Sequence, residues 1–173
     1  MSKLPIDASK IKAFVLDVDG VLSASKVQIG EDGQPVRTAN VKDGLAIRMA
    51  LSQGYRIAVI TGGRSEEVPL RFRLLGVTDI FNNVSRKLPV YEQWRFDNGL
   101  DEEEIAYMGD DIPDLPCLRH CGLPSAPYDA ASEVLQTAVF ISKFSGGYGC
   151  VRDLIESVMR ARGNWEDACK RYF

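Results

Sequence analysis

At 173 residues, with 45% hydrophobic and 26% charged side chains, the chain has the composition of a single soluble globular domain spanning residues 1–173. Its net charge of −3 offers no basic surface for nucleic acid or an anionic membrane, so neither partner is expected. No apolar run approaches the ~18 residues of a membrane helix, and residues 1–5 lack an apolar signal segment. We therefore expect a cytoplasmic protein whose four cysteines are free thiols.

The first part of the chain combines a buried strand with an acidic turn and a hairpin. Residues 1–10 carry no periodic pattern and are predicted to form a loose N-terminus. The apolar run 11–16 predicts a buried strand, which ends in the acidic turn 17–20. Residues 26–38 alternate around a glycine-containing turn, and this alternation predicts a β-hairpin flap.

The rest of the chain alternates between strand and helix patterns. Asp43 is the predicted N-cap of the first helix, and residues 163–173 form a C-terminal tail that either packs on the domain or covers a subunit interface. Strands are predicted near residues 55–60, 78–83, 105–108, 122–126 and 139–141, and helices near residues 43–51, 65–75, 88–96, 115–121, 130–136 and 150–162. This alternation predicts an α/β fold with a three-layer, doubly wound, Rossmann-like parallel sheet.

Two aspartates follow the first buried strand. Asp17 and Asp19 should leave the sheet at its C-terminal edge, where open α/β sheets bind ligands. Neighbouring carboxylates can hold a hard cation such as Mg²⁺, and an aspartate can also attack phosphorus as a nucleophile. Taken alone, the pattern is more typical of a strand followed by a turn that an aspartate side chain stabilises.

Groups with complementary chemistry occur near three later strand ends. Thr61 and Gly62 offer a hydroxyl and backbone N–H groups for phosphate oxygens, and Lys87 is a cation that can neutralise a transferring phosphoryl group. A second acidic loop, suited to completing a Mg²⁺ site, contains Asp110, Asp111 and Asp114. Each part has an ordinary structural explanation, but four parts in this order predict a single site.

These motifs resemble those of the haloacid dehalogenase-like superfamily of phosphotransferases, over roughly residues 11–160. The resemblance implies that Asp17 is the nucleophile, that Asp19 is the general acid and then the base, and that Thr61 and Lys87 assist catalysis. It also implies a Mg²⁺ site formed by Asp17, the Asp19 carbonyl and Asp110. Asp111 and Asp114 would surround these ligands without binding the metal and would position Lys87. Because Asp19 is present, phosphatase chemistry is favoured over that of the ATPases and dehalogenases.

The spacing of the motifs leaves no room for a cap domain. Residues 18–60 hold one hairpin and one helix, and residues 62–86 hold one helix and one strand. The hairpin and the segments 17–22, 40–44 and 109–114 are similar to those of the uncapped 3-deoxy-D-manno-octulosonate 8-phosphate phosphatases. That family implies a homotetramer in which the hairpin of one subunit closes the site of a neighbour.

The same resemblance implies a set of substrate contacts. Asp19, Thr61, Gly62 and Lys87 would bind the phosphate end, and the sugar acid would contact Asn40, Val41, Lys42, Asp43, Gly44, Arg48 and Arg71. An arginine can bind a carboxylate through two hydrogen bonds, although arginines on predicted helices are as often simply solvated.

Two positions depart from the family pattern. Many members have Thr-Gly-Arg after the second strand of the sheet, whereas this chain has Gly63 followed by Arg64, which is a further candidate for the substrate carboxylate. The later Gly-Gly-Arg-Gly of the family has Tyr148 in place of its arginine. Both departures concern sugar recognition and leave the residues of phosphoryl transfer unchanged.

The resemblance implies a Mg²⁺-dependent phosphatase that hydrolyses 3-deoxy-D-manno-octulosonate 8-phosphate through an aspartyl-phosphate and supplies the sugar acid for lipopolysaccharide biosynthesis. Two alternatives stay open. One is a phosphatase for a nine-carbon 2-keto-3-deoxy sugar acid 9-phosphate of the sialic acid type. The other is a catalytically silent binding domain on the same fold.

Overall fold

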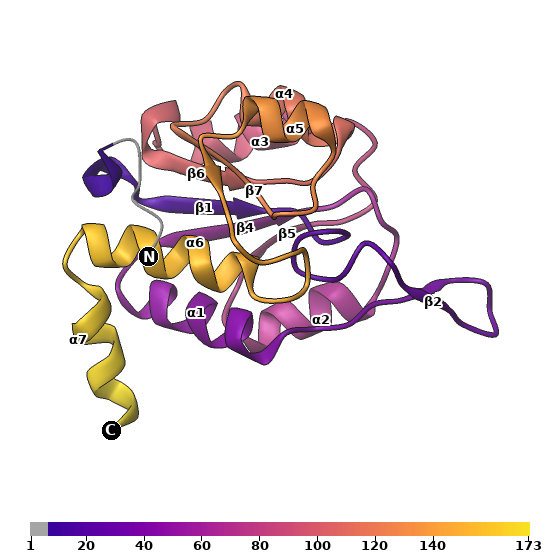
Figure 1. Ribbon diagram of the computed structural model, residues 1–173, viewed down its shortest axis with the longest axis horizontal. Coiled ribbons are helices and arrows are strands. Elements are labelled where there is room, and N and C mark those ends of the chain that lie inside the picture. Colours follow the sequence, from indigo (N-terminus) through magenta and orange to yellow (C-terminus); the bar gives the residue numbers. More distant parts are fainter. Residues whose placement is uncertain (1–6) are drawn as a thin grey trace.

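A six-stranded parallel sheet forms the centre of the molecule in the computed structural model, which describes residues 7–173 (Figure 1). The strand order is β5-β4-β1-β6-β7-β8. The strands are β1 (Ala13–Leu16), β4 (Arg56–Ile60), β5 (Asp79–Phe81), β6 (Ile105–Met108), β7 (Leu123–Ala126) and β8 (Phe140–Ile141). Because β1 lies between β4 and β6, the chain reverses its direction of strand addition beside β1, which is where such sheets bind ligands.

Helices cover both faces of this sheet, so the predicted three-layer α/β architecture is confirmed (Figure 1). One face carries α1 (Val41–Ser52), α2 (Glu67–Leu74), α6 (Cys150–Ala161) and α7 (Trp165–Cys169). The opposite face carries α3 (Lys87–Asp97), α4 (Leu115–Leu118) and α5 (Ser132–Thr137). Short 3₁₀ turns are η1 (Ala8–Lys10), η2 (Glu102–Glu104), η3 (Ile112–Asp114) and η4 (Lys170–Tyr172).

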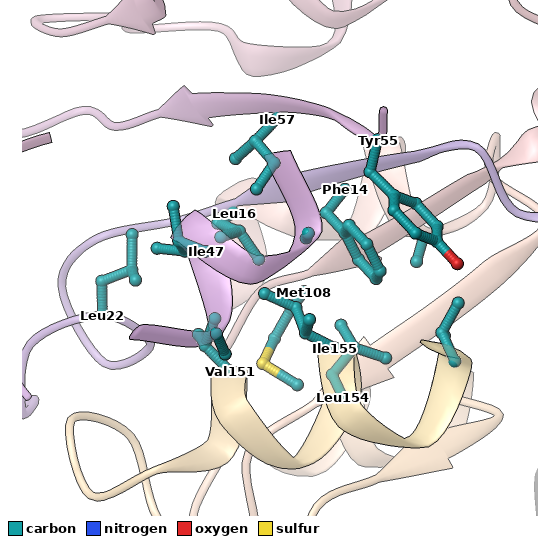
Figure 2. Close-up of a cluster of buried hydrophobic side chains, with 14 of the residues drawn as sticks. Phe14, Leu16, Leu22, Ile47, Tyr55, Ile57, Met108, Val151, Leu154 and Ile155 are labelled. Atoms are coloured by element: carbon teal, nitrogen blue, oxygen red, sulfur yellow. The ribbon is translucent and has the colours of Figure 1, made fainter. Parts of the chain in front are cut away.

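Strand β1 is buried on both sides because it lies at the centre of the sheet. Ala13 and Val15 face the α3–α5 layer, whereas Phe14 and Leu16 face α1 and α6. Figure 2 shows Phe14 and Leu16 packed among side chains of α1 and α6, including Ile47. This packing fixes the position of Leu16, the last residue before the acidic turn.

A two-stranded flap projects from the edge of the molecule (Figure 1). Its strands β2 (Gln28–Ile29) and β3 (Pro35–Val36) pair antiparallel, as the sequence predicts, and are shorter than expected. At its base, the Thr38 amide donates a hydrogen bond to Ser23 Oγ over 3.1 Å. The described chain between β1 and β4 holds only this flap and α1, in agreement with the predicted lack of a cap domain.

The start of α1 differs from the prediction. Asn40 is the N-cap and accepts a hydrogen bond from the Lys42 amide, so the helix begins before Asp43. Asp43 is buried instead, and its Oδ1 accepts a 2.7 Å hydrogen bond from the Arg152 amide. Gly149, the N-cap of α6, has no side chain to perform this task, so Asp43 of α1 caps the neighbouring helix.

The N-terminal turn and the first part of the C-terminal tail pack on the domain, whereas residues 170–173 are exposed. Residues 8–10, predicted as part of a loose N-terminus, form η1, and residues 1–6 of that prediction lie outside the described residues. In the tail, Trp165 is buried, with the guanidinium groups of Arg152 and Arg160 4.5 and 5.4 Å from its ring centre. All four cysteines are free, as expected. Across residues 7–173, every helix is too short or too polar to span a bilayer.

Candidate active site

The four sequence motifs meet at the C-terminal edge of the sheet. Asp17, Thr61 and Gly109 directly follow β1, β4 and β6, which are adjacent strands. Lys87 is the first residue of α3 and its side chain is buried. Because parallel strands all end at the same edge, residues far apart in the sequence lie together here.

Lys87 links two buried carboxylates. Its Nζ lies 2.8 Å from Asp17 Oδ1 and 2.7 Å from Asp114 Oδ1. Burial alone lowers the pKa of Lys87, but the charges of Asp17 and Asp114 outweigh this effect and raise it, so Lys87 is a cation. Burial and the charge of Asp114 raise the pKa of Asp17, against the opposing effect of Lys87.

Asp114 is held by four hydrogen bonds. Its Oδ1 accepts from Lys87 and, over 2.7 Å, from the Tyr107 hydroxyl. Its Oδ2 accepts from the backbone amides of Asp110 and Asp111 at 3.2 and 3.4 Å. With both oxygens engaged, Asp114 orients Lys87 and the acidic loop. Tyr107 was missed by the sequence analysis, although a tyrosine inside a buried strand needs a partner for its hydroxyl.

The acidic groups of this edge fit a divalent cation that prefers oxygen ligands. Carboxylate oxygens of Asp17, Asp110 and Asp114 all lie within 4.8 Å of one another, close to a single lysine. Burial, followed by the charges of Asp114 and Asp111, raises the pKa of Asp110 to about 7. A bound cation would relieve this repulsion. Gly20 leaves the space for Asp110, because a Cβ there would overlap the Asp110 carboxylate.

Thr61 and Gly62 form a small polar turn beside these groups. The Thr61 side chain is buried and its Oγ1 accepts a hydrogen bond from the Gly63 amide over 3.1 Å. The hydroxyl proton of Thr61 is therefore directed elsewhere and can serve a phosphate oxygen. Helix α2 begins only at Glu67, so the turn itself, and not the helix N-terminus, borders the acidic groups.

Asp19 is bound by an arginine that the sequence analysis did not identify. Arg37, at the base of the flap, donates from Nε to Asp19 Oδ1 over 2.7 Å and from Nη2 to Oδ2 over 2.9 Å. The Asp19 side chain is 43% exposed and that of Arg37 is 12% exposed. The only sequence signal was a cation on the returning strand of the predicted hairpin.

A cleft of about 800 Å³ opens between the flap and α2, and Arg37, the partner of Asp19, lies on its wall. Among the predicted sugar contacts, its walls within residues 7–173 include Arg64 and Arg71, but not 40–44 or Arg48. Three of the remaining candidates are exposed on α1, namely Val41, Lys42 and Arg48. The other three are engaged within the domain. Asn40 donates a hydrogen bond to the Gly147 carbonyl, Asp43 caps α6, and Gly44 lies against the side chains of Arg71 and Leu75. These placements leave Arg64 and Arg71 as the predicted sugar contacts that face the cleft of the same chain.

Comparison with known proteins places this fold in a known class. A hydrolase assigned to the HAD (haloacid dehalogenase-like) superfamily, subfamily III A, from Legionella pneumophila has a TM-score of 0.93 at 34% identity, covering 98% of this chain and 93% of that chain. No protein-family model matches the sequence.

Two other proteins narrow the relationship. The 3-deoxy-D-manno-octulosonate 8-phosphate phosphatase KdsC of Escherichia coli K12 is 34% identical over 161 residues, covering 93% of this chain and 86% of the relative. The Moraxella catarrhalis 3-deoxy-D-manno-octulosonate 8-phosphate phosphatase, solved in complex with a magnesium ion, a phosphate ion and KDO, has a TM-score of 0.91 at 29% identity, covering 96% of each chain. The chain belongs to the 3-deoxy-D-manno-octulosonate 8-phosphate phosphatase family, as the resemblance predicted.

Proposed function

We propose that this protein is a Mg²⁺-dependent phosphatase that hydrolyses 3-deoxy-D-manno-octulosonate 8-phosphate in the cytoplasm and supplies the sugar acid for lipopolysaccharide biosynthesis. The observation that carries the proposal is the buried chain Asp17–Lys87–Asp114, which lies beside Asp110 at the edge of the sheet. A nucleophile, a fixed cation and a cluster of metal-binding oxygens are the groups that phosphoryl transfer requires. The family membership and the sugar acid bound by the Moraxella protein support the choice of substrate.

In the first half of the reaction, an Asp17 carboxylate oxygen attacks phosphorus. The bond from phosphorus to the sugar oxygen breaks, and Asp19 gives its proton to that oxygen. Lys87 neutralises the charge on Asp17 and on the transferring group, and the Thr61 hydroxyl donates to a phosphate oxygen. Bound Mg²⁺ would neutralise further charge on the phosphate, with Asp17, the Asp19 carbonyl and Asp110 as its ligands.

In the second half, the aspartyl-phosphate is hydrolysed. The Asp19 carboxylate takes a proton from water as the water oxygen attacks phosphorus. The bond from phosphorus to the Asp17 oxygen breaks, which restores the Asp17 carboxylate and releases inorganic phosphate. Proton transfer of this kind contributes ~10²–10⁴ in rate, so the orientation of Asp19 matters in both halves.

The carboxylate of the sugar acid is assigned to the cleft between the flap and α2. Arg64 and Arg71 lie on its walls, and an arginine binds a carboxylate through two parallel hydrogen bonds. The predicted contacts of the exposed residues Val41, Lys42 and Arg48 would then involve a neighbouring subunit, whereas Asp43 and Gly44 are buried within their own chain.

The test is Mg²⁺-dependent phosphate release from 3-deoxy-D-manno-octulosonate 8-phosphate, beside a nine-carbon 2-keto-3-deoxy acid 9-phosphate and simple sugar phosphates. We expect a strong preference for the octulosonate, loss of release in EDTA, and a loss of at least about 10³-fold for Asp17→Asn. The exposed Asp97→Asn is the matched control and should retain full activity. A preference for the nine-carbon acid would replace the substrate, and undiminished release by Asp17→Asn would exclude Asp17 as the nucleophile.

We also propose that the flap mediates a homotetramer. Its apolar side chains Ile29 and Val36 are 68% and 52% exposed, which is typical of a surface that another subunit covers. Light scattering should give the mass of four chains, and Ile29→Lys should lower that mass. A single-chain mass together with full activity would contradict this arrangement.

A further inference from the structure

Gly63 and Arg37 come from distant parts of the chain but share one small space beside Asp19. A Cβ built on Gly63 would lie 2.5 Å from Arg37 Nη2 and 2.9 Å from Asp19 Oδ2. A carbon atom cannot lie this close to a nitrogen or oxygen atom without steric overlap. Any side chain at position 63 would therefore displace the guanidinium. The pairing of Arg37 with Asp19 therefore depends on glycine at position 63.

The backbone does not require glycine at this position. Gly63 is absent from the glycines whose φ is positive, so other residues can adopt its conformation. Arg64, the next residue, lines the cleft, while the space beside Asp19 is filled from the flap by Arg37.

We propose that Arg37, which occupies the space beside Gly63, is the positioning residue for Asp19, a role that rests on the proposed function. Asp19 lies in a turn and is nearly half exposed, so its carboxylate is free to rotate unless it is held. The planar guanidinium binds both oxygens of the Asp19 carboxylate, which is the form that takes a proton from water in the second half of the reaction, and selects one orientation. The base of the flap is thereby joined to the residue that transfers protons.

The consequence is a dependence of turnover on the position of the flap. Arg37 stands directly after β3, and the neighbouring Thr38 amide is bound to Ser23. When the flap base is docked in this way, Asp19 is oriented, and when it moves away, Asp19 loses its partner. Asp17 and Lys87 do not depend on this contact, because they are bound to each other in the interior.

A double-mutant cycle tests whether Arg37 and Gly63 affect turnover through the same contact with Asp19. Arg37→Ala should lower kcat by about 10- to 100-fold and change KM by less than about threefold, because orientation of Asp19 matters most in the transition state. Gly63→Ala should lower kcat by about tenfold by displacing Arg37. In the Arg37→Ala background, the added Gly63→Ala should change kcat by less than about twofold, because the guanidinium is already absent and the Asp19 carboxylate, no longer held by it, can turn away from the new methyl group.

Further variants separate positioning from a general loss of charge or structure. Arg37→Lys should restore only part of kcat, because an ammonium cannot hold both oxygens. Arg73→Ala removes an exposed arginine of α2 and is the matched control, with unchanged kcat. Additive effects of Arg37→Ala and Gly63→Ala, or an unchanged kcat for Arg37→Ala, would overturn the proposal.

The assay uses p-nitrophenyl phosphate as well as the sugar phosphate. With both substrates, an error in the proposed sugar substrate can be distinguished from an error in the proposed role of Arg37. Turnover of p-nitrophenyl phosphate alone would contradict the sugar substrate, while the cycle would still test Arg37. Amide hydrogen exchange of residues 28–38 provides a readout independent of turnover. Both single variants should accelerate exchange at Thr38, and the double variant should match Arg37→Ala; unchanged exchange in Arg37→Ala would contradict the docking contact.

Discussion

The C-terminal edge of the sheet and the flap hold the two aspartates of the acidic turn in different ways. Asp17 is buried and bound to Lys87, which is bound in turn to Asp114. Asp19, two residues later, is nearly half exposed and bound to Arg37 at the base of the flap. The residue assigned to bond formation is thus fixed by the core, whereas the residue assigned to proton transfer is fixed by a projecting element. Adjacent catalytic groups can therefore have independent structural supports.

The difference follows from what each region is packed against. Lys87, at the start of α3, is buried together with Asp114 and Tyr107, so these partners are removed from water and hydrogen bonds hold them in place. The flap strands pair only over Gln28–Ile29 and Pro35–Val36, where three of the four residues are exposed and Pro35 is half-buried. Substitutions in the two regions should consequently differ in their effect on stability.

The largest effect is expected from Lys87→Ala, which would break the buried region. It leaves Asp17 and Asp114 buried without their cation, and such a loss costs about 3–5 kcal/mol of unfolding free energy. Urea unfolding followed by tryptophan fluorescence measures this change. Lys170→Ala, which removes an exposed pair with Asp167, is the control and should change stability by less than about 1 kcal/mol. Equal effects would show that Lys87 is not a structural support.

A smaller effect, dependent on pH, is expected from Asp43→Asn. Burial raises the pKa of Asp43 to about 6 from 3.8, and its Oδ2 has no partner among the described residues. The folded state therefore holds the proton more tightly, and stability is lost as the pH rises through this interval. Asparagine keeps the acceptor for the Arg152 amide without the charge. Its stability relative to the native protein should rise by about 2 kcal/mol between pH 4 and pH 7.

The pH dependence can be attributed to Asp43 only if the other charged and titratable groups near it do not change their charge between pH 4 and pH 7. These are Arg152 and Cys150 of α6, and burial raises the pKa of the Cys150 thiol, so that this group stays neutral over the interval. Unfolding curves of both proteins at four pH values provide the measurement, with Asp97→Asn as the control. A difference that does not vary with pH would mean that Asp43 is not titrating in the folded state.

The smallest effect is expected in the flap, from Ile29→Thr. This side chain is 68% exposed, so the unfolding free energy of a single chain should change by no more than about 0.5 kcal/mol. Thermal and urea unfolding at several protein concentrations measure it. A larger loss at all concentrations would show that the flap packs within its own chain, and a loss that grows with concentration would report self-association.

Short-range patterns predicted much of the site. Asp17, Thr61, Lys87 and Asp110 could be assigned to one edge because each lies near the end of a strand and parallel strands end together. The flap was recognisable from alternation around a glycine-containing turn. Cap assignment was less reliable, since the sequence near Asp43 offers two capping residues within four positions and cannot show which of them faces another helix.

By itself, the sequence determined the order of strands and helices, the family, and the acidic and basic groups at the strand ends, because these depend on local periodicity and on motifs. Only the tertiary structure decided which groups pair. Asp43 reaches an amide 109 positions away, and Arg37 reaches Asp19 across 18 positions through a space that Gly63 leaves open. Such contacts depend on how separate elements approach each other in three dimensions, and no local pattern along the chain encodes that distance.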